Sequence, residues 1–153
     1  MPQPYVHPFY RIWFTTVDPI VLFFTVLTCI FSPATILETV VPHEVEPFNP
    51  VSHGGLLHQA AALYGFCGII YGVLLRVSLD PKVWRIVQAA TLGVDVSLLA
   101  TLYNLLRLQG RTDVTTWHGG DWFNMLFTVW VALIRVGFLL GIGEENEETK
   151  KVR

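Results

Sequence analysis

Hydrophobic residues occur along this chain in long, nearly unbroken blocks and do not alternate with polar residues. Four blocks have about the length, roughly 20 residues, that a helix needs to cross the hydrocarbon core of a bilayer. The strands of a membrane barrel would instead alternate between apolar and polar residues in segments of about 10 residues. The pattern therefore predicts an all-α fold, a four-helix transmembrane bundle, with helices over residues 18–41, 56–77, 83–106 and 122–142.

The composition agrees with a membrane protein, because 52% of the residues are hydrophobic, 14% are charged and the mean hydropathy is +0.50. The residues before the first block have the aromatic composition of a membrane interface, through Tyr5, Phe9, Tyr10, Trp13 and Phe14. We therefore expect three parts: an interfacial aromatic segment over residues 1–17, a membrane domain over 18–142 and a charged tail over 143–153.

The basic residues outside the four blocks or near their ends predict the orientation of the chain. Lys and Arg accumulate in cytosolic loops, and seven of these nine residues lie in the N-terminal segment, the second loop and the tail. Both termini are therefore expected in the cytosol. The final letters, KKVR, resemble the dilysine retrieval signal of endoplasmic reticulum membrane proteins, which predicts a multi-pass protein of that membrane. A plain solvated tail is the alternative reading.

Two short motifs recur along the chain. An Asp-Pro pair opens the first and third blocks, at Asp18 and Asp80. A His-Gly-Gly triplet precedes the second and fourth blocks, at 53–55 and 118–120. The repeat suggests two parallel helical hairpins. Locally, Asp before Pro predicts an N-cap followed by the first helical residue, and Asp121 can cap the fourth helix. Capping is thus favoured over catalysis for these three aspartates.

Two charged residues lie well inside the predicted helices. Asp95 is near the middle of the third block, and Arg135 lies in the fourth. Counted from the same membrane face, their depths differ by five residues, or about 7.5 Å at 1.5 Å per residue, which an arginine side chain can span. We expect the two to form an ion pair. Ionisable residues inside a membrane are functional candidates, but a pair also holds helices in register, and both roles remain open.

Other polar side chains gather near the end of the bundle opposite the termini. A carboxyl group in apolar surroundings can protonate an alkene or epoxide, and a second group can take up a proton. This chemistry suits an acid-base cyclase or isomerase. The proposed catalytic residues are Glu38 as acid with His58 or Asp121 as base. The proposed substrate-binding or orienting residues are Asn104, Asn124, Asp95, Arg135 and Trp122. The alternative is ordinary polar capping near an interface.

Several other chemistries are disfavoured by the sequence. It has no phosphate-binding glycine loop, HExxH, CxxC or nucleophile elbow. A metal site would have to use His53, His58, His118 and Glu38, whose spacings match no ligand pattern, so we expect neither metal nor cofactor. The net charge of −2 does not indicate a nucleic-acid-binding surface.

Expected partners are the lipid bilayer and a lipophilic small molecule. Small residues in the second block, at positions 61, 65, 68 and 72, favour close helix packing and also permit a homodimer or a complex with other membrane enzymes.

Four segments carry a family resemblance: FYRIWFTTVDPI, SPATILE, HGGDWFN and RVGFLLGIG. In these segments the chain resembles small four-helix integral membrane proteins of filamentous fungi that carry a domain of unknown function. The resemblance implies a four-helix architecture, a fungal source and a connection to secondary metabolite biosynthesis. Two hypotheses follow: an enzyme acting on an isoprenoid- or polyketide-like metabolite, or a non-catalytic scaffold for other enzymes of the endoplasmic reticulum.

Overall fold

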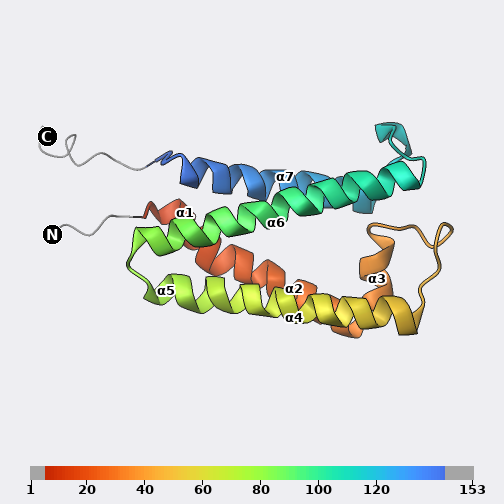
Figure 1. Ribbon diagram of the computed structural model, residues 1–153, viewed down its shortest axis with the longest axis horizontal. Helices are drawn as coiled ribbons and strands as arrows, with labels where there is room; N and C mark the ends of the chain where they lie inside the picture. Colours follow the sequence, from red (N-terminus) through yellow and green to blue (C-terminus); the bar gives the residue numbers. More distant parts are fainter. Residues whose placement is uncertain (1–5, 144–153) are drawn as a thin grey trace, which may run out of the picture.

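The computed structural model describes residues 6–143, which form an all-helical bundle (Figure 1). Four helices are long and apolar enough to cross a membrane: Pro8–Phe31, Pro50–Val77, Pro81–Leu108 and Gly119–Leu139. No strand occurs among the described residues. The predicted all-α fold with four helices long and apolar enough to cross a membrane is thus confirmed, although the helix boundaries differ from those expected, most of all for the first helix.

The spans are built from helical segments of different pitch. The first consists of α1 (Pro8–Ile12), the π-helical turn η1 (Trp13–Val17) and α2 (Asp18–Phe31). The second consists of η2 (Pro50–Gly54), α4 (Gly55–Ile69), η3 (Ile70–Leu74) and α5 (Leu75–Val77), of which η2 and η3 are also π-helical. The third and fourth spans are α6 (Pro81–Leu108) and α7 (Gly119–Leu139). The connections contain the short helices α3 (Pro33–Glu38) and η4 (Val114–Thr116).

The first span begins at Pro8, ten residues before the predicted start at residue 18. Asp18 and Pro19 therefore lie inside it. Pro19 has no N–H to donate to the carbonyl of Thr15, and its ring crowds that carbonyl. The helix widens into the π turn η1 at this point. Arg76 of the second span then donates to the Thr15 carbonyl from Nη2 at 2.7 Å and from Nε at 3.2 Å. The chain therefore continues as a helix through the proline.

The first span ends at Phe31, ten residues before the predicted limit. Ser32 has left the helical region, with φ −142° and ψ 55°, as expected for a residue that precedes a proline. Pro33 then starts the separate helix α3. The sequence predicted one helix over residues 18–41, but the structure has a break at Ser32.

The aromatic residues before Asp18 were expected at the membrane interface, but two of them lie in the core. Tyr10 and Phe14 are buried, and each packs edge to face against Phe138 of α7, with ring centroids 5.3 and 5.4 Å apart. The core cluster draws on all four spans and consists of Tyr10, Phe14, Tyr71, Leu75, Trp84, Ile134 and Phe138. We call this end of the bundle, where both described ends of the chain lie, the terminal end.

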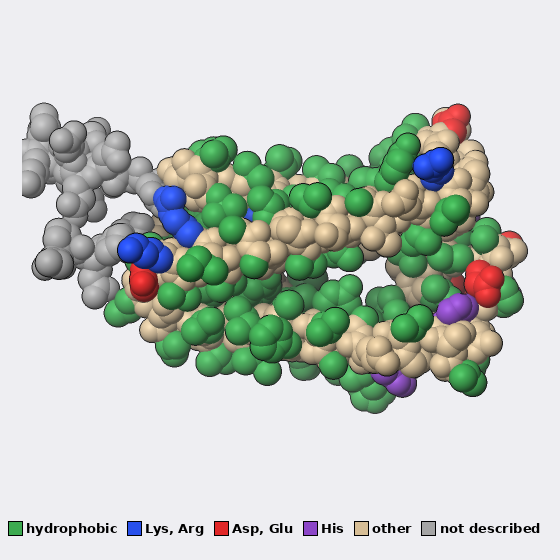
Figure 2. All heavy atoms as spheres, in the orientation of Figure 1, with side chains coloured by type: hydrophobic (Ala, Val, Ile, Leu, Met, Phe, Trp, Pro, Cys, Tyr) green, Lys and Arg blue, Asp and Glu red, His purple; other side chains and the backbone are tan. Residues whose placement is uncertain are grey.

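The four spans are arranged as two pairs, with α2 along α4 and α6 along α7. In the first pair, Gly68 and Gly72 of the second span lie against Leu22 and Pro19 of α2, as predicted for close packing, whereas a methyl group on Gly65 would meet nothing within 4 Å. The two pairs meet in the core at the terminal end. Figure 2 shows an opening between α4 and α6, which lies nearer to the opposite, far end of the bundle.

The far end is closed again by the segment that follows α3. Two side chains of the α6/α7 pair donate to its backbone: Gln109 Nε2 to the carbonyl of Val40, and Asn124 Nδ2 to the carbonyl of Thr39, both at 3.1 Å. Hydrophobic side chains cover much of the lateral surface, and the charged side chains visible in Figure 2 gather at the two ends. This distribution is that of a protein surrounded by lipid.

Candidate functional site

Three charged residues from three spans meet inside the bundle. Arg135 of α7 donates from Nη1 to Asp95 Oδ2 of α6 at 2.9 Å and from Nη2 to Asp18 Oδ2 of α2 at 2.7 Å. The three residues are buried, with exposed fractions of 3% for Arg135, 5% for Asp18 and 7% for Asp95. We refer to Asp18, Asp95 and Arg135 as the ion network. The predicted pairing of Asp95 with Arg135 is confirmed.

Asp18 is the member of the network that the sequence reading missed. Its predicted role as an N-cap is wrong, because the preceding Val17 is helical and the helix runs through Asp18 without a cap. A signal was present in the sequence: once Asp18 is placed within a span, it is a third intramembrane charge, and such charges face a partner. The sequence predicts a helix start at Asp18 because an Asp-Pro pair favours that position.

The charges of the ion network do not balance when all three groups are ionised. Two carboxylates against one guanidinium carry −1, and the sum becomes zero when one carboxyl group holds a proton. Asp95 uses Oδ2 for Arg135, and its other oxygen accepts no hydrogen bond from a described residue. Its side chain is 10% exposed. Asp95 therefore has a carboxylate oxygen available for a ligand or a proton.

A row of polar side chains leads from the ion network toward the terminal end. Gln88, Thr91 and Asp95 lie on one face of α6 at positions i, i+3 and i+7. The hydroxyl of Thr91 contacts the hydroxyl of Tyr71 in η3 and donates to its own helix at the Val87 carbonyl. We call Gln88, Thr91, Asp95 and Tyr71 the polar row.

Some polar atoms near this region have no hydrogen-bond partner among the described residues. Gln88 is fully buried, and neither its amide nitrogen nor its amide oxygen is bonded. The same holds for Nε of Arg135 and Nε1 of Trp13. Buried polar groups are normally satisfied, so unsatisfied ones need an explanation.

The structure places a second ion pair at the far end. Asp121 is buried, accepts from the backbone N–H of His118 at 2.8 Å and forms an ion pair with Arg111. Arg111 also donates to Gln109 Oε1 at 2.6 Å. The predicted N-cap role of Asp80 is confirmed, since it accepts from Lys82 N at 2.9 Å. Asp121 is not the N-cap of α7: that residue is His118, and Asp121, the third residue of the helix, forms a capping box with it. The role of Arg111 was not foreseen.

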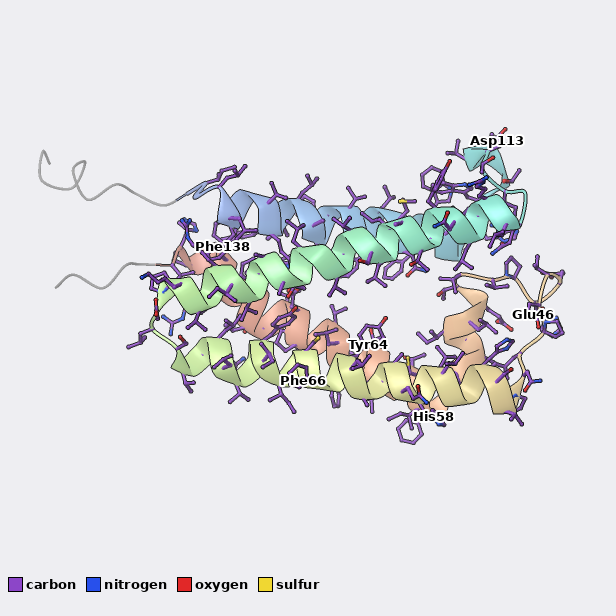
Figure 3. All side chains as sticks on the ribbon, in the orientation of Figure 1. Glu46, His58, Tyr64, Phe66, Asp113 and Phe138 are labelled. Carbon is purple, nitrogen blue, oxygen red and sulfur yellow. The ribbon has the colours of Figure 1, made fainter. Side chains whose placement is uncertain are left out.

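The other residues proposed for the site do not form one bonded cluster among the described residues. Glu38, His58 and Asn104 are exposed, and Figure 3 places His58 on the side of α4 that faces away from α6. Asn124 is engaged with the backbone of Thr39, and Trp122 packs against Trp117 with centroids 4.9 Å apart. Within residues 6–143, no hydrogen bond or ion pair links Glu38, His58 and Asp121. That part of the chain also contains no group of His, Cys, Asp or Glu side chains placed to hold a metal.

The two His-Gly-Gly triplets differ in their surroundings. A methyl group on Gly120 would lie 2.6 Å from the carbonyl oxygen of Thr39, whereas one on Gly54 would meet only Phe48, at 3.7 Å. Gly120 is therefore required for the close approach of α7 to the segment after α3.

In the far-end loop, Asp113 accepts from the N–H and hydroxyl of Thr115, and these bonds hold the pKa of its carboxyl group below the ordinary value.

Comparison with known proteins gives one match. A family model described as Domain of unknown function (DUF7704) matches residues 4–145. Neither a curated protein nor a solved structure matches the chain significantly.

Proposed function

We propose that this chain, which belongs to the DUF7704 family of proteins with a domain of unknown function, is a multi-pass membrane enzyme that acts on a lipophilic metabolite by acid-base chemistry. The observation that carries the proposal is the Asp95 carboxylate. It is held by Arg135 inside the bundle through one oxygen only. The ion network is neutral when it holds one proton and charged when it has released it, as an acid-base group requires.

The arrangement of the helix pairs favours a lipophilic substrate. The opening between α4 and α6 faces the lateral surface of the bundle (Figure 2), where lipid-soluble molecules are at their highest concentration. In our proposal the apolar body of the substrate occupies this opening and its reacting group meets Asp95. Apolar walls with a few polar groups are typical of small-molecule sites.

The reaction class follows from the chemistry of one carboxyl group. In this scheme Asp95 gives its proton to an alkene carbon or an epoxide oxygen, and the carboxylate that this leaves takes up a proton from another carbon, so the framework is isomerised or cyclised without net oxidation. Asp18 and Arg135 position Asp95 in this scheme. It replaces Glu38 and His58 as the reacting groups, because both are exposed and not bonded to one another. Substrates of isoprenoid or polyketide type suit this chemistry.

We place the terminal end in the cytosol and the protein in the endoplasmic reticulum membrane. Support comes from Arg11, Arg76, Lys82 and Arg85, which flank the described spans at that end. The dilysine letters lie outside the described residues. Two parallel hairpins and a fungal source, with a role in secondary metabolism, complete the proposal on the grounds of the motif repeat and the resemblance described above.

The alternative is a non-catalytic scaffold or binding partner of other membrane enzymes. It is favoured by one observation, that the ion network ties three spans together and would serve to hold their register. A homodimer or a complex with other membrane enzymes belongs to this alternative.

Mass spectrometry of lipophilic extracts separates the two. The extracts come from the native host without the gene and from the same strain complemented with the wild type, Asp95→Asn or Glu38→Gln. We expect a compound to disappear and its precursor to accumulate without the gene, with rescue by Glu38→Gln but not by Asp95→Asn. The amount of each variant in membranes is measured in parallel. Rescue by Asp95→Asn, or unchanged extracts while the gene is expressed, would refute the enzyme proposal.

A further inference from the structure

Buried polar residues of α6 lie only on the side of Asp95 toward the terminal end. The buried residues of α6 on the terminal side of Asp95 include Gln88, whereas those on the far side are Leu102 and Leu106. Gln88 is fully buried and both of its amide atoms lack a partner among the described residues. Burying an unbonded amide is costly. A leucine would fill a place in this aromatic core without that cost, so the glutamine calls for a compensating role.

The polar groups of α6 follow one another at intervals of three and four residues, about one helical turn each. Gln88 is seven residues from Asp95, about 10.5 Å along the helix axis, and the contacting hydroxyls of Thr91 and Tyr71 lie between them. The unpartnered Nε of Arg135 adds a donor at the inner end of the row. Two π-helical turns, η1 and η3, lie in contact at this level of the bundle, and such turns are frequent at functional sites.

We propose that the polar row is a proton path between the ion network and the water at the terminal end. Buried amides and hydroxyls of this kind hold water in hydrogen-bonded chains, and rows of polar groups leading to a buried acid carry protons in membrane proteins. A proton from water passes along these hydrogen bonds and converts one carboxylate of Asp95 or Asp18 into a carboxyl group. The charge of the network then changes from −1 to zero, and the reverse passage restores it. The titratable and charged side chains around the row are Asp18, Cys67 and Arg135, with Tyr10 in the adjoining core.

The proton path builds on the ion network of the proposed function but needs no substrate. An enzyme of the proposed kind would use it to reset Asp95 after a turnover. Its test uses the purified, full-length protein alone, so failure of the proton path is distinguishable from failure of the enzyme proposal, which is tested on metabolites.

The test is hydrogen-deuterium exchange of the buried carboxyl group, followed by infrared spectroscopy after rapid dilution of the protein in lipid nanodiscs from H₂O into D₂O. The pH is set where the carboxyl band is half developed, and the band is assigned by its loss in Asp95→Asn or Asp18→Asn. We expect Gln88→Leu to slow exchange about ten- to a hundred-fold, the rate change that corresponds to one lost buried hydrogen bond. Tyr71→Phe is expected to slow it in the same direction.

Matched controls are available on the exposed surface. Gln59→Leu and Tyr103→Phe remove the same groups from exposed positions and should leave exchange unchanged. Gln88→Leu should also unfold at about the wild-type temperature, since the amide is not bonded to any described residue, whereas replacing a glutamine with a purely structural role would lower that temperature. The proposal is overturned if Gln88→Leu exchanges at the wild-type rate, or if no carboxyl band of Asp18 or Asp95 develops at any pH at which the protein is folded.

Discussion

Replacing Arg135 with glutamine removes the only cation that lies between Asp18 and Asp95 within the described part of the chain. The change deletes two charge-assisted hydrogen bonds, of 2.7 and 2.9 Å, and leaves two carboxylates buried without compensation. Removing one partner of a buried ion pair costs about 3–5 kcal/mol. Asp95→Asn should cost less, about 1–3 kcal/mol, because Arg135 keeps its bond to Asp18.

The structure also predicts which combination restores stability. In the triple variant Asp18→Asn, Asp95→Asn, Arg135→Gln the network consists of neutral amides, so no buried charge is left uncompensated. This variant should be more stable than Arg135→Gln alone, although it has two more substitutions. The double variant Asp95→Asn, Arg135→Gln should recover less, because Asp18 remains without a cation.

The assay is thermal unfolding in detergent, with membrane accumulation as a second measurement. A loss of 3–5 kcal/mol lowers the melting temperature of a chain of this size by roughly 10 °C. Arg107→Gln is the matched control, since Arg107 is exposed in the last turn of α6. If Arg135→Gln melts within about 1 kcal/mol of Arg107→Gln, or if the triple variant is no more stable than Arg135→Gln, the reasoning about the network is wrong.

Three further predictions concern single contacts. Arg76→Gln should cost about 1 kcal/mol, and less in a Pro19→Ala background, where the helix regains the missing N–H; additive costs in a double-mutant cycle would contradict the compensation. Gly120→Ala should cost about 1–3 kcal/mol by overpacking, whereas Gly55→Ala, whose added methyl meets nothing, should be neutral or stabilising in the same melting assay. In an NMR titration the Asp113 carboxyl should show a pKa below 3.8 that rises in Thr115→Val. The stabilisation from this lowered pKa is present above pH 3.8 and is lost as the pH falls through the lowered value, and an unchanged titration in Thr115→Val would count against it.

The architecture was predictable from the sequence because it rests on local properties. The length of an apolar block decides whether a helix can cross a membrane, so the number of spans was visible without any tertiary contact. The caps at Asp80 and Asp121 depend on residues within one helical turn. The pairing of Asp95 with Arg135 was also accessible, because a charge in hydrocarbon requires a partner and only a few partners lie at a suitable depth.

The contacts that shape the site were decided by the tertiary structure. Asp18 could be recognised as a partner of Arg135 only once the first span was known to run through Pro19, and that depends on a donor, Arg76, supplied from another span. The need for Gly120 arises only where α7 meets the backbone of Thr39. The sequence by itself determined that four segments are long and apolar enough to cross a membrane, since hydropathy and length belong to each segment alone. The helix faces that contact each other depend on packing between residues far apart in the chain. This packing brings the ion network together and buries Gln88 near it.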